Sequence, residues 1–143
     1  MVLVIKFLKI IIIYLLLAKP LYAEVQIVQD DLGGPMDLRY NEYMEYDGYF
    51  EIRGKCYSAC GMRLWDPVRQ RLRACARNDD DFGFHGIYSG GLWDDERMKI
   101  YAQFLPPSMR SWWWKNATPL WMNKLVHLSG AEMIARGWVL RCT

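Results

Sequence analysis

Two short segments carry side chains that could perform covalent chemistry together. In Gly54–Gly61, Ser58 follows a β-prone stretch and is surrounded by small residues. In Phe82–Gly86, His85 lies in an apolar run between glycines. A serine hydroxyl becomes a nucleophile when a base removes its proton, and histidine is the usual base at neutral pH. The pair therefore indicates attack on an acyl carbon.

Backbone N–H groups near the serine could stabilise the oxyanion that such an attack creates. Ser58 is expected to begin a helix, where the N–H of Ala59 points outward from the positive end. Gly33 and Gly34 form a flexible loop whose N–H groups could face the same carbonyl. Each feature also has an ordinary interpretation, with Ser58 as a helix N-cap, His85 as a structural histidine and the glycines as a turn.

The chemistry requires strands that end close together and helices that begin there. β-Prone stretches cover 25–28, 49–53, 72–76, 82–88 and 138–141. Helical patterns cover 35–46, 58–65, 94–105, a piece from 108, 120–126 and 129–137. Ser129 and Glu132 have the spacing of a capping box. Because strands alternate with helices, the sequence predicts a single-domain α/β layered fold.

The first 23 residues are typical of a secretory signal peptide. Lys6 and Lys9 precede the apolar run Ile10–Ala18, which is far shorter than the roughly 20 residues that span a bilayer. We therefore expect residues 1–23 to be a signal peptide and 24–143 to be the domain. The alternative is an uncleaved N-terminal anchor, which would be the only attachment to a membrane.

All four cysteines lie in the expected mature chain, which fits an exported protein, periplasmic or secreted. Cys56, Cys60, Cys75 and Cys142 allow three disulfide pairings, and the sequence does not choose among them. No Cys-x-x-Cys pair is present and there are only two histidines, so we expect no metal and no cofactor. Two other readings are free buried thiols and a thiol-redox pair of Cys56 and Cys60, whose spacing is one residue too long for the usual motif.

Charge and aromatic content bear on the partners. Without residues 1–23 the chain has 15 basic and 16 acidic residues, a net charge of −1, which argues against a nucleic-acid binder. Trp112–Trp114, with Lys115 and Trp121, could pack the core, form a peptide or glycan surface, or mediate homo-oligomer contacts. Alternating arginines in Arg69–Arg77 predict a solvated strand face.

The order of these features resembles the Clp protease proteolytic subunit and crotonase superfamily. In that superfamily a strand leads into a Gly-Gly loop, a second strand presents a serine at a helix start, and a later strand ends in a histidine. Here Gly34 precedes Ser58 by 24 residues and His85 follows it by 27. Small exported bacterial members are more similar still, and the matching segments are Gly54–Cys60, Cys75, Gly83–His85, Tyr101–Trp112 and Cys142.

The resemblance implies a Clp/crotonase-like layered ββα fold with short strands and a helical C-terminal part. It also implies an exported serine hydrolase that acts on a peptide, as a peptidase, or on another acyl substrate. Ser58 would be the nucleophile and His85 its base. The oxyanion hole would come from the backbone of Ala59 and of Gly33 or Gly34.

The chain departs from that family at the third catalytic residue. The family has an aspartate just before its C-terminal helix, whereas Lys124–His127 contains no carboxylate. Asn123 and His127 are the neighbouring candidates to orient His85. The chain is also shorter than the protease subunit, so a chambered ring is not implied. The alternative function is a non-catalytic envelope protein that keeps the fold as a binding or scaffolding module.

Overall fold

The computed structural model describes residues 23–121 and 123–143, so the predicted signal peptide lies outside the described residues except for Ala23. The strands are β1 (Val25–Asp31), β2 (Tyr49–Tyr57), β3 (Trp65–Asp66), β4 (Arg71–Leu72), β5 (Ala74–Ala76), β6 (Asp81–Phe84), β7 (Tyr88–Ser89), β8 (Leu92–Trp93), β9 (Val126–Ser129) and β10 (Leu140–Arg141). The helices are α2 (Asp37–Glu45), the 3₁₀ helix η1 (Ser58–Arg63), α3 (Asp95–Ala102), α4 (Pro107–Asn116) and α5 (Gly130–Ala135). The prediction of an α/β domain is confirmed.

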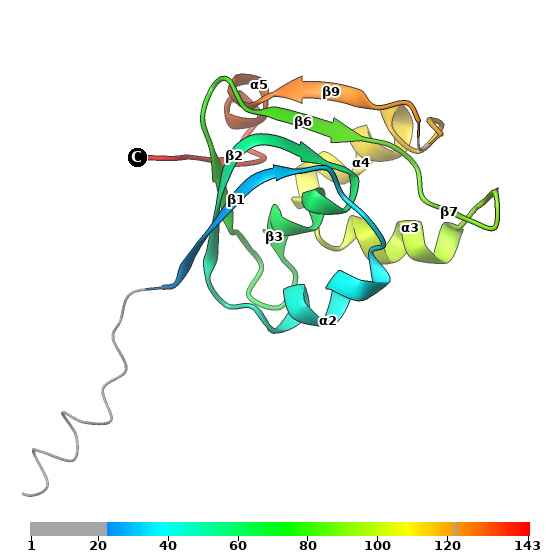
Figure 1. The fold of residues 1–143 in the computed structure, drawn as a ribbon, viewed down its shortest axis with the longest axis horizontal. Coiled ribbons are helices and arrows are strands. Elements are labelled where there is room, and N and C mark those ends of the chain that lie inside the picture. Colours follow the sequence, from blue (N-terminus) through cyan, green and yellow to red (C-terminus); the bar gives the residue numbers. More distant parts are fainter. Residues whose placement is uncertain (1–22, 122) are drawn as a thin grey trace, which may run out of the picture.

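Strand β2 is the centre of a curled, mixed sheet (Figure 1). Strand β1 pairs in parallel along one edge of β2. The other edge is occupied in turn by β5 and β6, both also parallel to β2. Outside them, β10 runs parallel to β5 and β9 runs antiparallel to β6. Because β2 and β6 are neighbouring parallel strands, their carboxyl ends meet at the same edge of the sheet.

Two carboxylates stabilise an irregularity in the middle of β2. Gly54 has φ of +81°, and the Asp80 carboxylate accepts its N–H at 2.7 Å. On the opposite edge, the Asp30 carboxylate accepts the N–H of Lys55 at 2.9 Å. The Asp80 carboxylate also accepts a hydrogen bond from the N–H of Arg77 at 2.7 Å. The backbone carbonyl of Asp80 accepts one from the N–H of Gly130 at 2.6 Å. Asp80 is therefore buried and structural, although it lies in an acidic turn.

Helices α2, α3 and α4 lie under the concave side of the sheet, and α5 lies beside its upper edge (Figure 1). The core between them is aromatic-rich. Its largest buried apolar side chains are Trp113, Tyr43, Phe50, Phe82, Phe84 and Phe104. Of the three consecutive tryptophans, Trp113 is buried and Trp114 is exposed. No helix in the described part of the chain is long and apolar enough to cross a bilayer.

The predicted helix over 120–126 is wrong. Val126 instead begins β9, where it pairs with Phe84, while Leu128 pairs with Phe82. The edge of β6 provides hydrogen-bond partners that outweigh the weak helical pattern of this segment. The predicted strand over 82–88 also ends early, at Phe84, because the chain leaves the sheet at His85. By contrast, the predicted capping box at Ser129 and Glu132 is present with both of its hydrogen bonds.

Arg73 contradicts the predicted solvated strand face, because it is fully buried. Its guanidinium donates to the carbonyl of Tyr43 at 2.7 Å and to that of Met62 at 2.9 Å. It also lies against the rings of Phe50 and Phe104. Burial lowers its pKa to about 10, which leaves it charged at neutral pH. A buried cation is tolerated here because carbonyl oxygens replace its water.

The four cysteines form two disulfides, Cys56–Cys60 and Cys75–Cys142. The first joins the end of β2 to η1 and is fully buried. The second joins β5 to the residue that follows β10. The predicted disulfide framework is thus present, and none of the four cysteines is a free thiol in this structure.

The two disulfides are expected to contribute unequally to stability. The bridge Cys75–Cys142 spans 67 residues and Cys56–Cys60 only 4. When a bridge is replaced by two alanines, loop-closure entropy predicts a loss in unfolding free energy of about 4 kcal/mol for Cys75–Cys142 and about 2 kcal/mol for Cys56–Cys60. Urea denaturation of the two double variants measures this difference. Equal losses would contradict it.

Candidate active site

Ser58 lies at a sharp turn between β2 and η1. Its φ is +54°, in the left-handed region that serine rarely adopts. That conformation costs about 1–2 kcal/mol and persists only when the surrounding structure enforces it. Strained residues of this kind concentrate at functional sites, and a strand-to-helix turn is the usual place for an exposed serine nucleophile.

Two contacts hold this turn. The disulfide Cys56–Cys60 joins the residues two positions before and two positions after Ser58. From α3, the hydroxyl of Tyr101 donates to the carbonyl of Ser58 at 2.7 Å. Tyr101 is buried, and burial raises the pKa of its phenol. The hydroxyl therefore remains protonated and continues to act as a donor.

The Gly33–Gly34 loop lies directly against the serine. A Cβ added to Gly33 would stand 2.6 Å from Ser58 Cβ and 3.2 Å from the backbone nitrogen of Ala59. Only glycine permits this approach, and Gly33 also has φ of +94°. The N–H of Gly33 is already used, because it donates to Asp31 Oδ1 at 2.9 Å. Among the predicted oxyanion donors, the N–H groups of Gly34 and Ala59 remain, and both residues line the pocket.

The Asp31 carboxylate joins this loop to two other elements. Arg39 of α2 donates to Asp31 Oδ2 at 2.6 Å and to the carbonyl of Gly33 at 2.8 Å. Arg63, the last residue of η1, also donates to Asp31 Oδ2. Burial raises the pKa of Asp31, but hydrogen bonds from Arg39, Gly33 and Arg63 outweigh it and hold the pKa below its ordinary value. The charged carboxylate thus fixes the glycine loop relative to η1.

His85 follows β6, directly beside the end of β2. Tyr57 pairs with Gly83, so Ser58 and His85 leave the two neighbouring strands at the same edge. The Nδ1 atom of His85 contacts the carbonyl of Gly86, which can only accept. Nδ1 therefore carries the proton in the neutral ring, and Nε2 keeps a free lone pair. Burial lowers the pKa of His85, partly offset by the bond to Gly86, so the ring is neutral at pH 7.

Gly86 is itself fixed by the segment that follows α4. Its N–H donates to the carbonyl of Leu120 at 3.0 Å. A Cβ added to Gly86 would stand 2.4 Å from the carbonyl oxygen of Thr118. A backbone carbonyl therefore takes the place where a serine protease has a carboxylate. Sequence reasoning missed this group because every residue carries a carbonyl, so no side-chain signal distinguishes Gly86.

Neither residue predicted to orient His85 forms a hydrogen bond with it. His127 lies on β9 opposite Gly83, and its Nδ1 is 3.1 Å from Asp81 Oδ1. Asn123 is exposed in the loop before β9. The Asp81 carboxylate also accepts a hydrogen bond from Tyr57. This group is a separate cluster beside the sheet.

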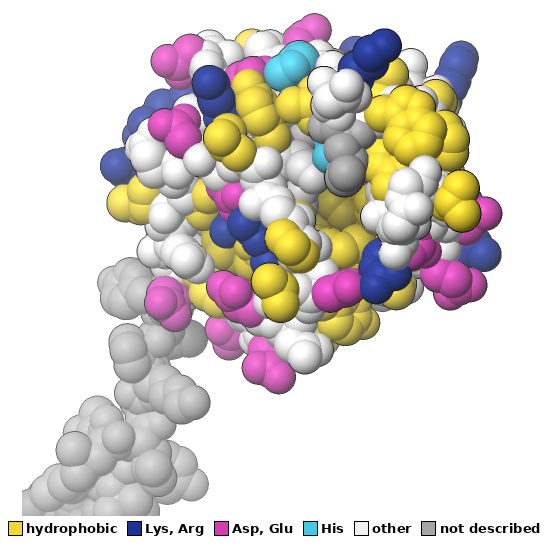
Figure 2. Space-filling model, turned by 45° about the vertical axis from the view of Figure 1, so that its right-hand side comes forward, with side chains coloured by type: hydrophobic (Ala, Val, Ile, Leu, Met, Phe, Trp, Pro, Cys, Tyr) yellow, Lys and Arg dark blue, Asp and Glu magenta, His cyan; other side chains and the backbone are white. Residues whose placement is uncertain are grey.

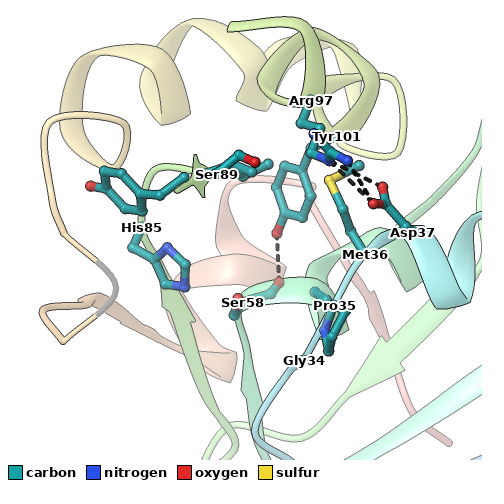
Figure 3. A pocket seen from close by; sticks show the side chains of 12 residues that line it. Gly34, Pro35, Met36, Asp37, Ser58, His85, Ser89, Arg97 and Tyr101 are labelled. Atoms are coloured by element: carbon teal, nitrogen blue, oxygen red, sulfur yellow. Dashed lines mark hydrogen bonds and ion pairs between the residues drawn. The ribbon is translucent and has the colours of Figure 1, made fainter. Parts of the chain in front are cut away.

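Ser58 and His85 border one pocket of about 470 Å³. Figure 3 shows them on one side of it, with Arg97 and Asp37 on the other. The remaining lining is largely apolar and includes Met36, Pro35, Ile87, Tyr88 and Tyr101. Within the described residues, the Ser58 hydroxyl makes no hydrogen bond to His85. Catalytic hydrogen bonds are often loose without a substrate, so their absence does not argue against the pair.

The chain matches no protein-family model and no curated protein sequence.

Replacing Gly33 tests whether the glycine loop is fixed by its contact with the serine. Gly33→Ala should reduce the unfolding free energy by about 3 kcal/mol, because the left-handed backbone and a clash with Ser58 add together. Gly137→Ala is the matched control, since Gly137 has φ of +72° and open space around it. It should lose only about 1 kcal/mol. Similar losses in thermal or urea unfolding would show that the contact is unimportant.

Proposed function

We propose that this protein is a serine hydrolase that acts on a peptide or other acyl substrate, with Ser58 as the nucleophile and His85 as the general base. One observation carries the proposal: a serine in a strained strand-to-helix turn shares a pocket with a neutral histidine 27 residues away. The resemblance to the Clp/crotonase superfamily supports it, and we propose that the domain has that layered fold.

The reaction follows from the placement of these groups. Nε2 of His85 takes the proton of the Ser58 hydroxyl as Oγ attacks the acyl carbon. The developing oxyanion accepts hydrogen bonds from the backbone N–H groups of Ala59 and Gly34. His85 then returns the proton to the leaving group, which departs and leaves an acyl ester on Ser58. Water, deprotonated by His85, attacks this ester, and His85 returns the proton to Ser58 Oγ as the bond to the acyl carbon breaks and the acid leaves.

The carbonyl of Gly86 affects the expected rate. It holds His85 in the correct tautomer, which is one of the two roles of the aspartate in a serine protease. It carries only a partial negative charge, so it stabilises the imidazolium less than a carboxylate would. We therefore expect a reactive serine but a slow hydrolase.

We further propose that the protein works outside the cytoplasm, in the periplasm or after secretion. The two disulfides support this, because such bridges persist in oxidising compartments. The pattern of residues 1–23 supports export as well.

A second candidate function is a non-catalytic binding or scaffolding module of the cell envelope. The observation in its favour is the uncharged partner of His85, since Nδ1 contacts a carbonyl instead of a carboxylate. In this case Ser58 would be unreactive and the pocket would only bind.

Labelling with a fluorophosphonate probe distinguishes the two functions. The purified, oxidised protein should be labelled at Ser58, because His85 activates its hydroxyl. Ser58→Ala should abolish labelling, and His85→Gln should reduce it by at least about 100-fold, the usual contribution of a general base. Ser111→Ala, an exposed serine on α4, should not change it. A folded protein without labelling would refute the hydrolase.

The labelling rate should depend on pH in a way set by the burial of His85. Only the neutral ring can accept a proton, and burial lowers its pKa below the ordinary 6.5. The rate should therefore be constant from pH 7 to 8 and fall by half at a pH below 6.5. Labelling rates measured from pH 5 to 8 give this midpoint. A midpoint above 6.5 would contradict the role of His85.

A further inference from the structure

Tyr88, Trp93 and Trp121 form a row of aromatic rings beside the pocket, and we call these three residues the aromatic platform. Tyr88 lines the pocket, and its ring lies nearly parallel to that of His85, with centroids 6.4 Å apart. Trp121 stacks on Tyr88 at 4.4 Å, and Trp93 contacts Trp121 at 4.2 Å. The platform thus extends from the candidate base to the surface, and Figure 2 shows hydrophobic side chains beside the hollow.

The platform is held by a hairpin and by the segment after α4. Tyr88 of β7 pairs directly with Trp93 of β8. Gly90 and Gly91 connect the strands with φ of +59° and +80°, the conformation that favours tight two-residue hairpins. Trp93 Nε1 donates to the carbonyl of Thr118 at 2.7 Å. The rings are therefore positioned before any ligand binds.

The hydrogen-bonding groups of Tyr88 and Trp93 are directed into the protein. The Tyr88 hydroxyl donates to the carbonyl of Leu120, and Trp93 Nε1 is occupied as described. Meanwhile Trp93 and Trp121 are 45% and 43% exposed. A sugar ring would need polar partners for its hydroxyls, which Tyr88 and Trp93 do not offer. An aromatic ring needs only a flat apolar face for offset stacking.

The charges around the pocket favour an uncharged ligand. Arg97 is the cation that lines it, and its guanidinium is 2.8 Å from Asp37 Oδ2 and 2.6 Å from Asp94 Oδ2. Two carboxylates therefore already neutralise Arg97. Asp94 directly follows Trp93 in the chain. Among the described residues that line the pocket, no cation is left unpaired for a free carboxylate.

We propose that the aromatic platform is the subsite for the acyl group, and that the substrate is a neutral ester or amide whose acyl group carries an aromatic ring. Hydrolysis of this ester or amide rests on the proposed function. Binding of the aromatic ring does not depend on that function, because the platform is separate from the Ser58 hydroxyl. The two can therefore be tested independently.

Binding is tested with the Ser58→Ala protein, by following tryptophan indole N–H signals in NMR titrations with neutral amides. We expect 3-phenylpropanamide to bind at least about tenfold more tightly than hexanamide, because only the former can stack. Trp121→Ala should remove this preference, and Trp121→Leu should remove it while retaining apolar volume. Trp114→Ala is the matched control, since Trp114 is similarly exposed but lies on α4, outside the aromatic platform.

Catalysis is tested with 4-nitrophenyl esters of the same two acids and the unaltered protein. The 3-phenylpropanoate should have a kcat/KM at least about tenfold above the hexanoate, and Trp121→Leu should make them equal. Equal binding of the two amides, or tighter binding of a chitin disaccharide, would overturn the subsite. Preferential ring binding without probe labelling would refute the hydrolase and leave the subsite intact.

Discussion

The left-handed backbone at Ser58 is the constraint on which the arrangement of the site depends. A serine does not adopt this conformation unaided, so neighbouring elements must enforce it. The disulfide to Cys60 closes the turn, Tyr101 holds its carbonyl from α3, and Gly33 leaves room for the side chain. The Asp31 carboxylate then joins the glycine loop to the far end of η1. Strain at one residue is thus distributed over contacts from three parts of the chain.

The sheet supplies the second requirement, which is that serine and histidine meet. Parallel pairing of β2 with β6 brings Ser58 and His85 to one edge although 27 residues separate them. That pairing begins at Lys55 and Asp81, directly after the irregularity at Gly54, where Asp30 and Asp80 accept backbone N–H groups from opposite edges. The two carboxylates therefore support β2 at the point where its pairing with β6 begins.

The sequence predicts those parts of the structure that follow from local chemistry. The capping box at Ser129 depends only on residues three positions apart, and the serine at a strand end depends on its small neighbours. The burial of Arg73 cannot be predicted in this way, because alternation indicates a strand but not which neighbours cover it; the core rings and carbonyls that surround Arg73 come from distant segments. The same holds for the segment 120–126, since the strand that pairs with its end is β6. The carbonyl of Gly86 has no sequence signal at all.

The two disulfides also differ in how much of the chain each one needs before it can form. Cys60 follows Cys56 by four residues, so this bridge needs only the end of β2 and the start of η1. Cys142 becomes available only after 67 further residues, including the whole of α3, α4 and α5, have followed Cys75. The bridge at the serine turn is therefore a local one, which no later part of the chain needs to reach. The native bridge of Cys75 needs β10 beside β5, so its closure reports that the two ends of the sheet have come together.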